Sequence, residues 1–162
     1  MKKFLMIALL VVAGTSVTFA QKNSVVGKWQ ITGFSSEGMS IDLENPASGK
    51  KVLAEQLKKE TGQTPDSATI EMTYNMMASM FSSMSCEFTQ DGQAIFSMPD
   101  ESGNTKKDIA KYTVDYTAGT LTTIESKDGK QETDVMKIKF EGEYLSLDNT
   151  KKGEVLKIKR MK

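Results

Sequence analysis

Residues 86–98 read Cys-Glu-Phe-Thr-Gln-Asp-Gly-Gln-Ala-Ile-Phe-Ser-Met, two short alternating runs on either side of an Asp-Gly pair. Asp91-Gly92 is a pair that tolerates the positive φ angles of a two-residue hairpin turn. Apolar and polar residues that alternate with a period of two are typical of strands with one buried face. The stretch therefore predicts a β-hairpin formed by residues 86–90 and 93–98.

The same pattern continues to the end of the chain. Turn sequences that contain Gly119, Gly129, Gly142 and Gly153 separate further alternating runs, and one more run lies near the start. Besides the hairpin, these runs are residues 25–34, 108–116, 120–125, 132–140, 143–147 and 154–160. Eight strands are enough for an up-and-down sheet to close around an interior that holds side chains or one small ligand. We therefore predict a mainly β fold, an eight-stranded antiparallel up-and-down barrel.

The first and last runs contain the only Trp and the only Arg of the chain. Trp29 is in phase with Val25 and Ile31, and Arg160 is in phase with Ile158, so both side chains are expected to face inward. An inward guanidinium needs a partner, and it can stack on an indole ring. We predict that Trp29 and Arg160 join the first strand to the last and so close the sheet.

About fifty residues between the first two runs do not alternate, and they predict a helical insertion at about residues 46–84. Residues 51–60 form a short amphipathic pattern that Gly62 would stop. A second helix is expected to begin with Thr64 as N-cap and Pro65 as its first residue, and to continue to about Ser83.

The order of these motifs resembles a known family. It begins with Gly-x-Trp and a helix-containing excursion, followed by Phe-Thr-Gln-Asp-Gly at residues 88–92 and Lys-Tyr-Thr-Val at 111–114. It ends with Tyr-Leu-Ser-Leu at 144–147 and Leu-Lys-Ile-Lys-Arg at 156–160. Together they resemble the secreted bacterial lipocalin-like domains, relatives of the calycin barrels. The resemblance implies a barrel closed at one end by Trp29 and Arg160, open at the other, and often able to bind a small apolar molecule.

A ligand inside such a barrel would contact the inward residues of several strands. Tyr112 and Tyr116 share a face with Ala110 and Val114, and their hydroxyls could orient a polar group of a ligand or reach water at the rim. The candidate interior residues are Phe88, Phe96, Tyr112, Tyr116, Met136, Ile138 and Leu145.

The second expected helix is rich in methionine, with Met72, Met76, Met80 and Met84 at successive i+4 positions. Three interpretations are open: Met as an adaptable filler against the barrel, a lid over a ligand, and a thioether site for Cu(I) that includes Cys86. The predictions include no metal ligands, and the copper interpretation is the weakest because i+4 steps spread the sulfurs around the helix. The candidate lid residues are Met77, Met80, Phe81 and Met84.

The first twenty residues are predicted to be a cleaved secretory signal peptide. Lys2 and Lys3 precede an apolar stretch of ten residues at positions 4–13, and Thr18-Phe19-Ala20 offers small residues for a signal peptidase. Removing 20 of 162 residues leaves a single domain at residues 21–162. The apolar run is too short for a permanent span of roughly 20 residues, so we expect a secreted or periplasmic protein with no stable membrane insertion after cleavage.

The composition excludes several classes of function. The absence of His removes the usual Ser-His-Asp and Cys-His catalytic sets and the common zinc sites, so no catalytic residues, no cofactor and no enzyme activity are predicted. Lys is interleaved with Asp and Glu, which gives nucleic acid no basic surface. We therefore predict a binding protein that encloses a small apolar or amphipathic ligand. The alternative is a filled barrel that docks on another envelope protein through the Met helix.

Overall fold

The computed structural model describes residues 24–36, 39–100, 102–127 and 129–162. The predicted signal peptide, residues 1–20, lies outside the described residues. Among the helices that are described, none is both long enough and apolar enough to cross a membrane.

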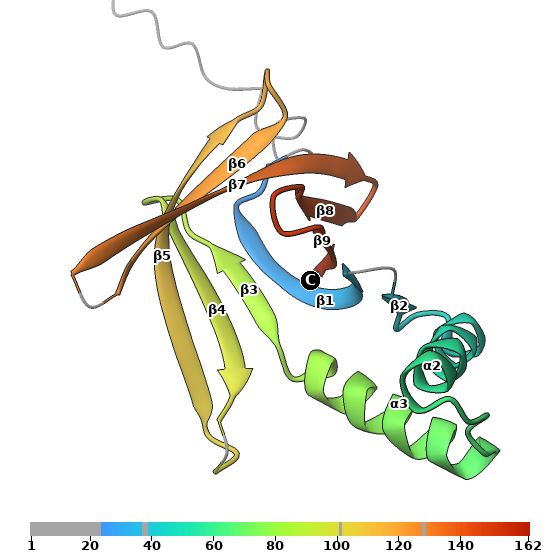
Figure 1. Cartoon of the computed structure of the whole chain (residues 1–162). Helices are drawn as coiled ribbons and strands as arrows, with labels where there is room; N and C mark the ends of the chain where they lie inside the picture. Colours follow the sequence, from blue (N-terminus) through green and yellow to red (C-terminus); the bar gives the residue numbers. More distant parts are fainter. Residues whose placement is uncertain (1–23, 37–38, 101, 128) are drawn as a thin grey trace, which may run out of the picture.

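Eight antiparallel strands form a closed barrel (Figure 1). Each of these eight strands pairs with the next one of the eight, and the last returns to pair with the first. The strands are β1 (Gly27–Ser36), β3 (Ser85–Phe88), β4 (Gln93–Pro99), β5 (Thr105–Asp115), β6 (Thr120–Lys127), β7 (Lys130–Glu141), β8 (Tyr144–Asn149) and β9 (Glu154–Arg160). The predicted up-and-down barrel is confirmed.

The pairing of β1 with β9 closes the barrel, and it begins at Trp29 opposite Arg160. Its register shifts between Ile31 and Gly33, so the inward phase of β1 passes from odd to even residues. Phe34 therefore lies opposite Leu156 and points into the barrel at the end away from Trp29.

A ninth strand, β2 (Met39–Asp42), was not predicted. It pairs only with residues 33–36 of β1, while β3 pairs with residues 27–30 of the same strand. The helical insertion therefore follows β2 rather than β1. Residues 39–42 read Met-Ser-Ile-Asp and do alternate, but they are at the shortest length at which alternation indicates a strand.

Two helices make up the predicted insertion, α2 (Pro46–Thr61) and α3 (Ser67–Ser82). Asn45 caps α2 by accepting a hydrogen bond from the Ser48 N–H, and Gly62 ends the helix in the left-handed conformation. The prediction of Thr64 as the cap of α3 was wrong. Asp66 is the N-cap, because its carboxylate accepts a hydrogen bond from the Thr69 N–H at 2.7 Å.

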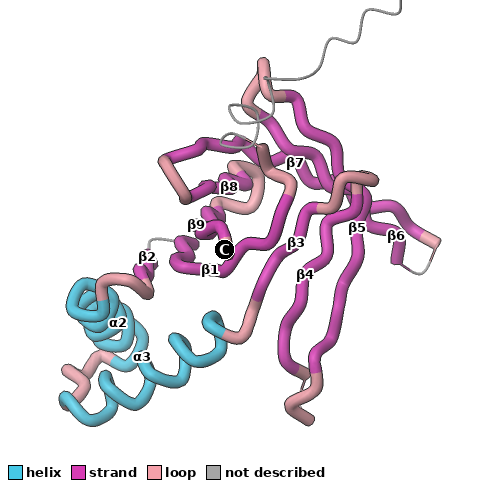
Figure 2. The backbone as a smooth tube through the Cα atoms, turned by 180° about the vertical axis from the view of Figure 1, so that it is seen from behind, coloured by secondary structure: helices cyan, strands magenta, loops and turns pink. Residues whose placement is uncertain are grey.

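The buried residues form two separate cores. The barrel core includes Trp29, Phe88 and Leu145, whereas Ile41, Leu53 and Tyr74 form a second core between β2, α2 and α3. Figures 1 and 2 show from opposite sides that the two helices stand beside the barrel rather than inside it. The barrel interior is therefore left to the side chains of its own strands.

Candidate ligand cavity at the open end

Arg160 links the last strand of the barrel to the start of the first strand. Its guanidinium stacks on the Trp29 ring, 4.2 Å from the ring centroid, and donates hydrogen bonds to the carbonyl oxygens of Val26 at 2.8 Å and Ser24. Gly27 makes room for it, because a Cβ at Gly27 would lie 2.7 Å from the guanidinium and its φ is +132°. The predicted contact between the two ends of the barrel is present in the structure.

Large apolar side chains fill the half of the barrel next to the contact between Trp29 and Arg160. Phe88, Leu121, Leu145 and Ile158 are all buried, and the Phe88 ring packs edge-on against Tyr112 with 5.0 Å between centroids. This half contains a packed core.

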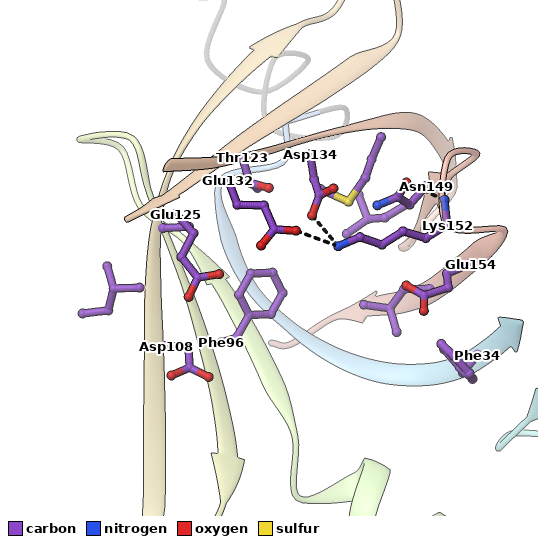
Figure 3. Close-up of a pocket in the computed structure, with 15 residues that line it drawn as sticks. Phe34, Phe96, Asp108, Thr123, Glu125, Glu132, Asp134, Asn149, Lys152 and Glu154 are labelled. Atoms are coloured by element: carbon purple, nitrogen blue, oxygen red, sulfur yellow. Dashed lines mark hydrogen bonds and ion pairs between the residues drawn. The ribbon is translucent and has the colours of Figure 1, made fainter. Parts of the chain in front are cut away.

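The other half of the barrel contains a cavity of about 270 Å³ (Figure 3). Its volume approaches the lower end of the range typical of small-molecule sites. The apolar part of the lining comes from six strands and consists of Phe34, Phe96, Ile109, Ala110, Met136, Leu147 and Leu156.

The polar part of the lining is dominated by carboxylates. Alternation carries Glu132 and Asp134 inward beside Met136 on β7, and Glu125 inward beside Thr123 on β6. The complete polar set is Asp108, Thr123, Glu125, Glu132, Asp134, Asn149, Lys152 and Glu154.

Lys152 is the one cation in this lining, and the turn between β8 and β9 positions it. Its backbone N–H donates to the side-chain oxygen of the buried Asn149 at 3.2 Å. Its ammonium lies 2.7 Å from Asp134 and 3.7 Å from Glu132, as the dashed lines in Figure 3 mark. The hydrogen bond from Lys152 lowers the pKa of Asp134, and the same contact raises the pKa of Lys152.

Two of the seven predicted interior residues, Phe96 and Met136, line the cavity. Phe88 and Leu145 belong to the filled half, and Ile138 packs against that core. The Tyr112 hydroxyl donates to the Thr89 carbonyl at 2.7 Å. Tyr116 is 54% exposed, and its hydroxyl accepts a hydrogen bond from the Val25 N–H.

None of the four predicted lid residues lines the cavity. Met77 packs in the helix core, Met80 is partly exposed, and Phe81 and Met84 pack against the barrel core. One of these residues contacts a residue of the cavity lining. The Phe81 ring stacks on Phe34, with ring centroids 6.0 Å apart, so the end of α3 lies next to the cavity.

The sulfur atoms proposed for copper do not converge. Met72 and Met76 are 68% and 66% exposed on α3, whereas Cys86 is buried in the barrel core. Within the described part of the chain, no three His, Cys, Asp or Glu side chains are grouped so that they could hold a metal ion.

A larger hollow of about 520 Å³ lies on the outer wall. It is lined by Lys137, Ser146 and Val155, whose neighbours along the strands point into the barrel. Its position outside the sheet leaves the open-end cavity as the interior site.

The comparisons with known proteins concern the fold. No protein-family model matches the chain, and no curated protein matches it in sequence. A DUF4847 family protein from Bacteroides vulgatus is similar in structure, with a TM-score of 0.54 and 12% identity over 84% of this chain and 93% of that chain. The closed barrel has the lipocalin-like fold that the sequence predicts, and this likeness concerns that fold alone.

Two other Bacteroides structures match with TM-scores of 0.47. One is a lipocalin-like protein from Bacteroides uniformis, 12% identical over 84% of this chain and 97% of that chain. The other is an uncharacterized protein from Bacteroides eggerthii, 11% identical over 85% of this chain and 100% of that chain.

Proposed function

We propose that this protein binds a small amphipathic molecule in the open-end cavity and does not catalyse a reaction. The observation that carries the proposal is a cavity of about 270 Å³ whose surface is mostly apolar and on which polar groups from several strands converge. A mostly apolar hollow with a few converging polar groups is the usual form of a small-molecule site. The packed half beneath it supplies a rigid base for such a site.

The proposal is tested with the neutral fluorescent probe N-phenyl-1-naphthylamine and a variant that fills the cavity. Ala110 lines the cavity, so Ala110→Phe should abolish the rise in probe fluorescence that the parent protein gives. Thr113→Phe adds the same ring to the exposed outer face of the same strand and should leave the titration unchanged. A parent protein that gives no saturable titration, or an Ala110→Phe variant that binds as before, would contradict the proposal.

We also propose that binding takes place outside the cytoplasm, in the periplasm or after secretion. Residues 1–20 support this proposal through their basic start, apolar stretch and small residues before Gln21. The measurement is N-terminal sequencing of protein recovered from the producing cells. A chain beginning at Gln21 supports the proposal, and a chain that keeps residues 1–20 contradicts it.

Docking on an envelope protein remains the second candidate function. Its supporting observation is that Met72, Met76 and Met80 form an exposed apolar row on α3, a feature that often marks partner surfaces. If docking is the function, Met72→Lys with Met76→Lys should remove a partner captured by cross-linking in intact cells. Probe binding in the barrel should survive that double substitution, so the two functions are separable.

A further inference from the structure

We propose that the ligand of the open-end cavity is a small amphipathic amine, bound as its ammonium cation. The inference rests on the function proposed above and specifies the ligand of that same site. The ammonium group would lie among the carboxylates, and the apolar body would lie against Phe34, Phe96 and Met136.

The first argument is the charge of the lining. Five carboxylates and one amine line the cavity, which gives the lining a formal net charge of −4. Lys106 lies 3.2 Å from Asp108 just outside the lining and reduces this charge by one. The chain as a whole has a formal net charge of zero, so the acidic charge is a local property of this cavity. A cleft lined by one sign of charge concentrates ligands of the opposite sign.

The second argument is that two of these carboxylates repel each other. Glu125 and Glu132 lie directly opposite on β6 and β7, and both line the cavity. Like charges at opposite positions of an antiparallel pair are destabilising. Lys152 relieves Glu132 only at 3.7 Å, because its closer contact is with Asp134. A cation between the two glutamates would remove the repulsion.

The third argument is that the cation already present is engaged. Lys152 is held by Asp134 at 2.7 Å, and no ion pair among the described residues involves Glu125 or Glu154. A carboxylate ligand would have to share Lys152 with Asp134 and enter a field of like charge. An ammonium ligand meets carboxylate oxygens that can accept its hydrogen bonds.

The experiment compares three probes with the same chain and different head groups: octylammonium, octan-1-ol and octanoate. Binding is followed by NMR of methionine methyl groups labelled with ¹³C. The Met136 methyl reports on the cavity, and the exposed Met72 methyl on α3 reports non-specific association. Octylammonium should bind at least about tenfold more tightly than octanoate, with octan-1-ol between them, and added salt should narrow the difference.

Two variants test whether the carboxylates cause this order. Glu125→Gln combined with Glu154→Gln should lower the ratio of octylammonium affinity to octan-1-ol affinity. Glu55→Gln combined with Glu60→Gln removes the same two charges from exposed positions on α2 and should leave that ratio at the parent value. An unchanged ratio in the double variant would overturn the role of these carboxylates.

The outcomes separate the two proposals. If all three probes move the Met136 signal with similar affinity, or if octanoate binds best, the inference fails and the binding function stands. If none of them moves the Met136 signal, the binding function fails and the inference fails with it.

Discussion

Arg160 is the residue that ties the last strand of the barrel to the chain before the first strand. Its guanidinium stacks on Trp29 and donates to the carbonyl oxygens of Val26 and Ser24. Arg160→Ala removes the stack and leaves both carbonyls without their donor. We expect the free energy of unfolding to fall by about 2–4 kcal/mol, measured by urea unfolding with Trp29 fluorescence as the signal.

Arg160→Lys and Lys111→Ala serve as comparisons for that prediction. Lysine keeps the charge but cannot reproduce the planar guanidinium. Arg160→Lys should therefore lower the free energy of unfolding measurably, but by less than Arg160→Ala. Lys111 points outward from β5, and its removal should change stability by no more than about 0.5 kcal/mol. Equal stability of Arg160→Ala and the parent would contradict the role of Arg160 in closure.

The thiol of Cys86 is a structural group, and its reactivity should report unfolding. Cys86 is buried in the barrel core, and this burial raises its pKa to about 12. Since the thiolate is the reactive form, Ellman's reagent should label the native protein very slowly at about pH 8 and the urea-unfolded protein at once. Rapid labelling of native protein would show that the core opens around Cys86.

At the scale of the elements, alternation and turn residues predicted the eight barrel strands, and β9 was predicted with its observed bounds. The N-terminal half of β1 was predicted correctly, but the register shift after Ile31 turns Phe34 inward. A sequence does not show a bulge, because the shift depends on the partner strand. The start of α2 was predicted five residues late, although Asn45 followed by Pro46 is a helix-start signal.

The helices and β2 have a core of their own, which predicts a local response to mutation. Leu53 is buried with Ile41 and Tyr74. Leu53→Ala should therefore lower the free energy of unfolding of the helices and β2 by about 2–5 kcal/mol. Amide hydrogen exchange should become faster in α2 and α3 while β7 and β8 keep their protection. Faster exchange in all of these elements would instead show that the two cores unfold together.

At the scale of the whole molecule, the barrel could be predicted from the sequence, but the boundary between filled and hollow halves could not. Phe88, Phe96, Leu145 and Met136 are all inward, yet only Phe96 and Met136 reach the cavity. Their depth depends on the stagger of the strands, which a single sequence does not state. The acidic lining did leave a signal, because Glu132 and Asp134 alternate in phase with Met136.

Because the strand pairings form a closed ring, we expect the stability of the barrel to depend on those pairings and not on the position of the chain termini. The two ends lie together, since the Met161 N–H donates to the Lys28 carbonyl at 2.9 Å and Arg160 donates to Ser24. We expect a circular permutant with a Gly-Ser linker from residue 162 to residue 24, opened between Ser102 and Gly103, to fold. The exposed turn at 102–104 lies outside the strand ladders. The free energy of unfolding of the permutant, measured in urea, should therefore stay within about 2 kcal/mol of the parent value.

A second permutant, opened between Ser146 and Leu147, is the matched control. These residues pair with both β7 and β9, so new ends there interrupt two ladders at once and should prevent folding. The octylammonium and octan-1-ol titrations should be the same for the first permutant as for the parent, because all the strands that line the cavity are intact. If the first permutant fails to fold while the second folds, the β4–β5 turn rather than the closed ladder would be what holds the barrel together.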